Sequence, residues 1–214
     1  MQVFSTRANL TGVVRILFGL VWLIDAQFKW RPAFIDGMTS YLSGAIPGQS
    51  APVAAWINFW VKVVKIDPTF FAYAVAAAET ALALALIFGV LSNLANLCGS
   101  ILSLMIWSTA EGFGGPYVIG TTDIGAAIIY VFVFALLSLS RSGLHLGLDP
   151  KLAGSLGSWA FLASGPIPDD KPVKLTVELP AELHRDLKRG QLDHRRRSNP
   201  HPFDPASGGI IQIE

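Results

Sequence analysis

The sequence predicts an all-α membrane protein: a four-transmembrane-helix bundle with an interfacial amphipathic helix and a polar C-terminal tail that contains a short strand and helix. The first observation is composition, because 52% of the 214 residues are apolar and only 14% are charged, whereas soluble domains carry roughly 25% charged residues. The second is the placement of charge. Between Phe70 and Ser140 the only acidic or basic side chains, tyrosine and cysteine aside, are Glu79, Glu111 and Asp123. Such a stretch lacks the polar surface that a water-soluble fold needs.

Four stretches are long and apolar enough to cross the hydrocarbon core, which takes about 20 residues of helix. Each should be helical, because lipid offers no partner to an unpaired backbone amide. Ser92 and Asn93 indicate a very short turn, so the second and third spans should form an antiparallel hairpin. The predicted spans cover residues ~10–30, 70–90, 94–111 and 124–140.

Residues ~51–66 are too short and too charged to span, and they predict a helix that lies in the membrane interface. On a helical projection Trp56 and Trp60 share one face, while Lys62 and Lys65 lie off it. Tryptophans in such a helix anchor it at the depth of the headgroups. The alternative is a re-entrant segment packed against the bundle.

The expected organisation is a transmembrane domain over 1–160 and a cytoplasmic tail over 161–214. An even number of spans places both termini on one side, and the basic tail favours the cytoplasm, so we expect an inner-membrane protein with N-in/C-in topology. In the tail, the alternation in 174–179 predicts a strand, and Pro180 opens a predicted helix that stops at Gly190. Strand followed by helix resembles the start of ribbon-helix-helix DNA-binding proteins, but the required second helix is missing. No nucleic-acid partner is therefore expected.

Three segments together resemble the DoxX/DoxD family of small four-helix membrane proteins. They are RILFGLVWLIDAQFKW in the first span, AAAETALALALIFGV in the second, and EGFGGPYVIGTTDIGAAIIY between the third and fourth. The resemblance covers residues ~10–140 and leaves out the tail. Because the family includes the DoxD subunit of thiosulfate:quinone oxidoreductase, the resemblance implies a quinone-linked redox function.

Arg15 and Glu79 lie inside the first two spans, where an ionisable side chain costs at least about 2.5–3.5 kcal/mol. With Lys29 and Phe70 taken as the outer ends of their spans, Arg15 is about 21 Å deep and Glu79 about 14 Å deep. An extended arginine side chain can bridge that difference, which predicts an intramembrane Arg15–Glu79 ion pair. The pair has either a functional role or the structural one of locking the two spans together.

The outer ends of the spans carry the acids Asp25, Glu111 and Asp123, next to a glycine-rich loop with Tyr117. A quinone site needs an apolar slot and a proton-exchanging acid near each carbonyl oxygen, so these four residues form the candidate quinone and proton site. Helix capping is the alternative for Asp123 and Glu111. Asp25 and Lys29 are four residues apart and should pair along one face.

Cofactor chemistry other than quinone is not predicted. The four histidines all lie outside the spans, so no haem or metal site is expected in the bundle, and no self-contained catalytic site is visible.

Two functions remain open. One is an integral membrane subunit of a quinone-linked, respiratory-type redox complex. The other is a non-catalytic accessory or assembly subunit that stabilises a larger electron-transfer or photosynthetic complex. In both, the partners are the lipid bilayer and other subunits, contacted through the helices and the tail. A transporter is a third and weaker alternative.

Overall fold

The computed structural model describes residues 2–165, and this part of the chain is entirely helical. It contains seven α-helices and three short 3-10 helices, with no strand among the described residues. The chain divides into two compact units, Met1–Pro168 and Asp169–Glu214. The strand and helix expected at 174–190 lie outside the described residues.

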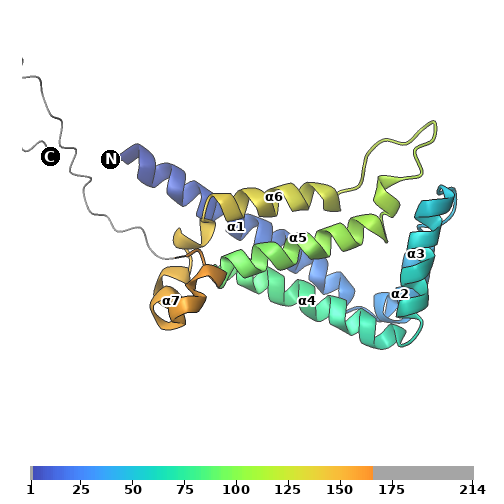
Figure 1. The fold of residues 1–214 in the computed structure, drawn as a ribbon, viewed down its shortest axis with the longest axis horizontal. Helices are drawn as coiled ribbons and strands as arrows, with labels where there is room; N and C mark the ends of the chain where they lie inside the picture. The colour runs from blue at the N-terminus through green and yellow to red at the C-terminus, as the bar shows by residue number, and fades with distance from the viewer. Residues whose placement is uncertain (1, 166–214) are drawn as a thin grey trace, which may run out of the picture. The chain divides into compact units, whose positions relative to one another are not determined.

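The α-helices follow one another with short connections except between α5 and α6, where a longer loop intervenes (Figure 1). Their bounds are α1 Gln2–Lys29, α2 Pro32–Ser43, α3 Ala51–Val64, α4 Pro68–Phe88, α5 Ser92–Ser108, α6 Ala127–Leu139 and α7 Asp149–Leu156. The 3-10 helices cover Gly112–Gly114, Ser142–Leu144 and Gly157–Leu162.

The hairpin of α4 and α5 shows how local sequence sets these bounds. The Asp67 side chain accepts a hydrogen bond from the Phe70 amide at 3.0 Å and caps the start of α4, with Pro68 in the first turn. Gly89 ends α4 in the left-handed conformation at φ 62°, which glycine adopts without steric cost. The turn is thus at 89–91, slightly earlier than the sequence predicted, and Ser92 already begins α5.

Helices α1, α4, α5 and α6 run side by side along the long axis and share one core (Figure 1). α1 packs on α4, and α5 packs on α6. Trp22, Leu86 and Phe134 lie at the centre of the shared core, each 2% exposed or less. Gly99 permits this packing, because a Cβ there would lie 2.3 Å from the Phe134 ring.

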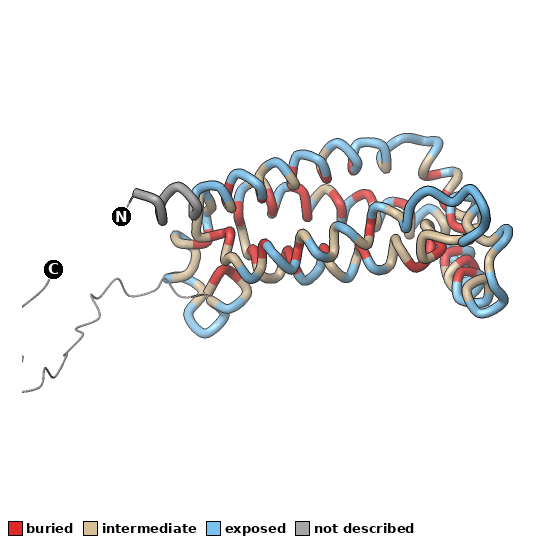
Figure 2. Tube along the Cα trace, turned by 90° about the horizontal axis from the view of Figure 1, so that it is seen from above, coloured by how far each residue is buried: buried red, intermediate tan, exposed pale blue. Residues whose placement is uncertain are grey.

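The bundle carries charge inside and large apolar side chains outside. Figure 2 shows how buried and exposed positions alternate along each helix. Arg15, Glu79 and Asp149 are fully buried. The exposed apolar side chains come from all four long helices and include Leu17, Val21, Ile24, Leu84, Phe88, Leu97, Ile101, Leu104, Ile129, Phe132 and Leu136. An exterior of this kind is suited to a non-aqueous solvent.

Helices α2 and α3 form a second, smaller core with the start of α4. α3 lies across one end of the bundle (Figure 1). It buries Ile57, Val61 and Val64 and leaves Trp56 39% exposed, with Trp60 half-buried beside it. The sequence predicted α3 but did not separate α2 from the connecting segment.

The four predicted spans correspond to α1, α4, α5 and α6, but only two of these helices are long and apolar enough to cross a membrane. The qualifying segments are Asn9–Lys29 and Pro68–Phe88. α5 has 17 residues and α6 has 13, short of the roughly 20 that a perpendicular span requires. The all-helical prediction is confirmed for the described residues, and two helices support an association with membranes.

Candidate functional site

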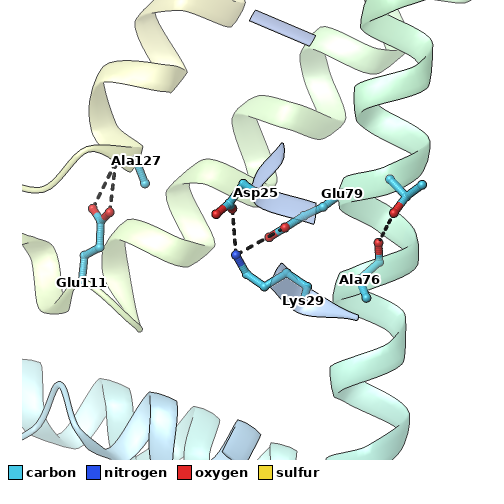
Figure 3. A network of polar contacts seen from close by, with 7 residues as sticks. Asp25, Lys29, Ala76, Glu79, Glu111 and Ala127 are labelled. Carbon is cyan, nitrogen blue, oxygen red and sulfur yellow. Dashed lines mark hydrogen bonds and ion pairs between the residues drawn. The ribbon is translucent and has the colours of Figure 1, made fainter. Parts of the chain in front are cut away.

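A buried ionic cluster of Asp25, Lys29 and Glu79 lies between α1 and α4 (Figure 3). Asp25 and Lys29 are one helical turn apart on α1, so both side chains reach the same side of the helix. The Lys29 Nζ lies 2.7 Å from Asp25 Oδ2 and 3.4 Å from Glu79 Oε2. The Glu79 side chain is fully buried, that of Lys29 is 13% exposed, and that of Asp25 is 51% exposed. Side-chain exposure therefore decreases across the cluster from Asp25 through Lys29 to Glu79.

Aromatic side chains surround the cluster and hold its two helices together. The Trp30 indole donates to Thr80 Oγ1 at 3.0 Å, one residue after Glu79. Phe34 of α2 places its ring centroid 5.6 Å from Lys29 Nζ. Tyr41, also on α2, is within electrostatic reach of Lys29, and partial burial raises the pKa of its phenol. The phenol is therefore a neutral hydrogen-bond donor at physiological pH.

The cluster places two carboxylates around one ammonium group. Lys29 compensates one negative charge, and neither oxygen of Glu79 has a hydrogen-bond partner among the described residues. A fully buried carboxylate with free lone pairs is a site for a proton or for a hydrogen-bonding ligand, because a buried acceptor left unpaired is costly. The arrangement is chemically suited to proton exchange.

The other predicted site residues, Glu111, Tyr117 and Asp123, are engaged locally. Both Glu111 carboxylate oxygens accept from the Ala127 amide, at 3.2 and 3.1 Å, and cap the start of α6 (Figure 3). Asp123 Oδ1 accepts from the Gly125 amide at 2.8 Å, and the Tyr117 hydroxyl donates to the Phe113 carbonyl. The structure thus gives Glu111 a capping role.

The loop itself holds an open depression of about 430 Å³. Asp123 is part of its lining, which is otherwise formed by residues 114–116 and 118–122. Asp25, Glu111 and Tyr117 do not line it. The four residues that the sequence grouped into one quinone site are therefore not gathered around this depression.

Arg15 and Glu79 have different partners, which corrects the ion pair predicted from the sequence. The Arg15 guanidinium donates to the carbonyls of Leu86 and Ile87 at the end of α4, and to His145 and Leu146. The reason is register. A Cβ on Gly19 would lie 2.9 Å from atoms of Leu86 and Ile87, so Gly19 packs against the last turn of α4. Counting back along α4 from this contact places Glu79 at the level of Asp25, about 15 Å along α1 from Arg15.

Asp149 and Ser92 complete the Arg15 end of the bundle; the sequence indicated Ser92 only as a turn residue and gave Asp149 no role. Asp149 is fully buried, and its Oδ2 accepts from the Ser92 amide at 3.2 Å and from the Ser164 hydroxyl at 2.8 Å. A cation therefore sits at the C-terminal end of α4 and an anion at the N-terminal end of α5, which suits both helix dipoles. The signal in the sequence was Asp149-Pro150, a pair typical of a helix start.

Neither a haem nor a metal site was predicted, and the described residues contain no group of three or more histidine, cysteine or acidic side chains that could hold a metal ion.

Comparison with known families finds one match in the tail. Residues 160–206 match a family described as a protein of unknown function (DUF2274). No curated protein and no solved structure matches the chain. The DoxX/DoxD resemblance is therefore wrong: no model of that family matches, and the DUF2274 match lies outside the residues that suggested it.

Proposed function

We propose that the chain is an inner-membrane protein with four spans, formed by α1, α4, α5 and α6, and with both termini in the cytoplasm. The support for four spans is that α5 and α6 share the core of α1 and α4 and expose apolar side chains of the same kind. α3, with Trp56 and Trp60, then lies in the interface at the outer end. α6 is short for a span, but the loop before it exposes apolar residues such as Ile119 and Ile124 that would extend the apolar length in the membrane.

Within this frame the chain acts as the membrane subunit of a quinone-linked redox complex, and Glu79 is its proton-exchanging group. The observation that carries this proposal is the fully buried Glu79 carboxylate, which forms an ion pair with Lys29 at 3.4 Å but has no hydrogen-bond partner among the described residues. An ionisable side chain inside a membrane protein marks a functional site by default, since its burial is costly. A quinone carbonyl oxygen is a hydrogen-bond acceptor that gains a proton on reduction, and Glu79 and Asp25 would supply it.

Quinone binding tests the proposal directly. The purified protein is titrated with decylubiquinone in detergent, and quenching of tryptophan fluorescence is followed, because Trp22 and Trp30 flank the cluster. Wild type should show saturable quenching. The reduced form, decylubiquinol, is titrated in the same way. Its hydroxyl donates to the Glu79 carboxylate, so Glu79→Gln should weaken quinol binding by about 10- to 100-fold, the value of one charge-assisted hydrogen bond of about 1.5–3 kcal/mol.

Glu111→Gln is the matched control, because it makes the same chemical change in a carboxylate that caps α6. Its quinone affinity should equal that of wild type. Quenching that never saturates, or equal affinity in wild type and Glu79→Gln, would exclude a quinone site at this cluster.

The second candidate is a non-catalytic accessory subunit, and a different observation favours it. Glu111, Asp123 and Tyr117 are committed to backbone groups, and Arg15 and Asp149 to the helix ends. An accessory role predicts that Glu79→Gln leaves turnover in native membranes unchanged. Deletion of residues 191–214 should then shift the protein to a smaller assembly on native gels.

A further inference from the structure

The last described segment, Gly157–Leu162 and the residues after it, keeps two large aromatic side chains outside the fold while it buries small ones. Trp159 and Phe161 are 60% and 59% exposed, and their rings are stacked with centroids 5.9 Å apart. Ala163 and Ser164, a few residues later, are buried. A fold in water gains most by burying its largest apolar side chains. The exposed pair therefore indicates that something other than water covers it.

Hydrogen bonds attach the segment that carries this pair to the end of the bundle at which α4 meets α5. The Asn93 side-chain amide, at the start of α5, donates to the Phe161 carbonyl at 3.0 Å. The Arg141 Nε donates to the Ser164 carbonyl at 2.7 Å. The Ser164 hydroxyl in turn donates to Asp149 Oδ2 at 2.8 Å. The level of the aromatic pair along the bundle is thus fixed by the fold.

A second stacked and exposed aromatic pair lies at the other end of the bundle. On α3, Trp56 and Phe59 are both exposed, with ring centroids 6.2 Å apart. α3 and α7 lie at opposite ends of the long helices (Figure 1), and α4 joins these two ends. The 21 residues of α4 measure about 32 Å at the rise of an α-helix. The two aromatic pairs are therefore separated by about the thickness of a hydrocarbon core, which is roughly 30 Å.

The exposed tryptophans of the described chain occur only at these two ends. Trp30, which follows α1 and stacks on Tyr73 near the start of α4, lies at the α3 end together with Trp56, whereas Trp159 lies at the other end. Tryptophan concentrates at both membrane–water interfaces, where its ring meets the acyl chains and its N–H stays hydrated. This distribution favours lipid over a protein partner at Trp159, because a protein contact would not require a matching aromatic pair one bilayer away.

We propose that Trp159 and Phe161 insert into the lipid headgroup region at the end of the bundle opposite α3, and so anchor the last segment of the bundle to the membrane surface. The inference rests on the four-span arrangement of the proposed function, in which this surface is the cytoplasmic one. The DUF2274 match begins at residue 160. The anchor therefore attaches the start of this family segment to the lipid.

Depth-dependent quenching of a fluorescent label tests the anchor. The full-length protein with Cys98→Ala carries the dye NBD on Ser158→Cys, an exposed position beside the pair. It is reconstituted in vesicles of phosphatidylcholine and phosphatidylglycerol that bear a nitroxide quencher on the acyl chain, either near the headgroup or near the chain end. The shallow quencher should be the more effective at this position. Absence of quenching by both lipids would place the pair outside the bilayer and would overturn the proposal.

Ile101→Cys, labelled in the same Cys98→Ala background, separates this proposal from the four-span arrangement. Ile101 is exposed on α5, nine residues after Ser92 and hence about 14 Å from the end of the bundle. That depth is close to the middle of the hydrocarbon core, so the deep quencher should be the more effective there. A label at Ile101→Cys that neither lipid quenches would overturn the four-span arrangement itself. Quenching at Ile101→Cys with none at Ser158→Cys would overturn the anchor alone.

Two substitutions of Trp159 in the Ser158→Cys background test the role of the indole. Trp159→Lys should lose most of the quenching by the shallow lipid, because a charged side chain is costly to bring among acyl chains. Trp159→Leu is the matched control, since it removes the same ring stacking but keeps an apolar side chain, and it should retain the quenching. Equal quenching in the two variants would show that Trp159 does not enter the lipid, and the proposal would be withdrawn.

Discussion

Replacing Arg15 by leucine removes the group that joins the end of α4 to the loop before α7. The fully buried guanidinium donates to four carbonyls, with distances of 3.3 Å to Ile87, 3.1 Å to His145 and 2.9 Å to Leu146, besides the bond to Leu86. A hydrogen bond to a charged group contributes about 1.5–3 kcal/mol, but bonds that share one donor do not add.

The loss of Arg15 also removes a positive charge that interacts electrostatically with buried Asp149. Breaking a buried charge arrangement on one side costs about 3–5 kcal/mol. We therefore expect Arg15→Leu to lower the free energy of unfolding by about 3–5 kcal/mol. Arg15→Lys keeps the charge but loses the planar fork of donors, so it should recover part of this loss.

The assay is unfolding of the purified protein by sodium dodecyl sulfate, followed by tryptophan fluorescence. The double variant Arg15→Leu, Glu79→Leu decides between the two arrangements of charge. Because Arg15 and Glu79 have separate partners, Glu79→Leu should not rescue Arg15→Leu. Rescue by Glu79→Leu, or a loss below about 1 kcal/mol for Arg15→Leu, would refute the register described above.

Three further predictions concern the loop, the α6 cap and the topology. Gly143→Ala should lower the free energy of unfolding by about 1–3 kcal/mol, because the new Cβ would lie 2.2 Å from Asp149 Oδ2. Gly37→Ala is the control, since nothing lies within 4 Å of its Cβ, and it should not destabilise the protein in the same detergent titration. Glu111→Ala removes the cap of α6 and should cost about 0.5–2 kcal/mol, whereas Glu111→Gln keeps an acceptor and should cost less; equal losses would show that charge, not capping, matters. A reporter fused after Glu214 should give a cytoplasmic signal, and a periplasmic signal would reverse the proposed orientation.

The helices could be predicted from the sequence because the interactions that begin and end them are local. Asp67-Pro68 and Gly89 bound α4 through a side-chain cap and a left-handed residue, and both act within one turn of the chain. The lysine–aspartate pair of α1 follows from a spacing of four residues alone. The sequence did not predict α2 as a separate helix, because its separation from α1 depends on the extended conformation of Arg31 between two apolar segments. The family resemblance read from the spans failed against the comparison with known families.

Partners of the buried charges were decided by the tertiary structure. The sequence identified Arg15 and Glu79 as costly to bury, but each side chain can reach several levels of a neighbouring helix. Their actual partners depend on the register of α1 against α4, which is fixed by packing contacts such as those of Gly19 with Leu86 and Ile87.

Glu111 and Asp149 show the same division. Their types and positions are plain in the sequence, whereas their roles follow from which helix end each one meets: Glu111 meets the start of α6, and Asp149 meets the start of α5. The sequence by itself determined which positions of the apolar segments carry ionisable side chains, because composition and spacing are local properties. Only the folded bundle decided what each charge binds, because a carboxylate is satisfied by any donor that packing brings within about 3 Å.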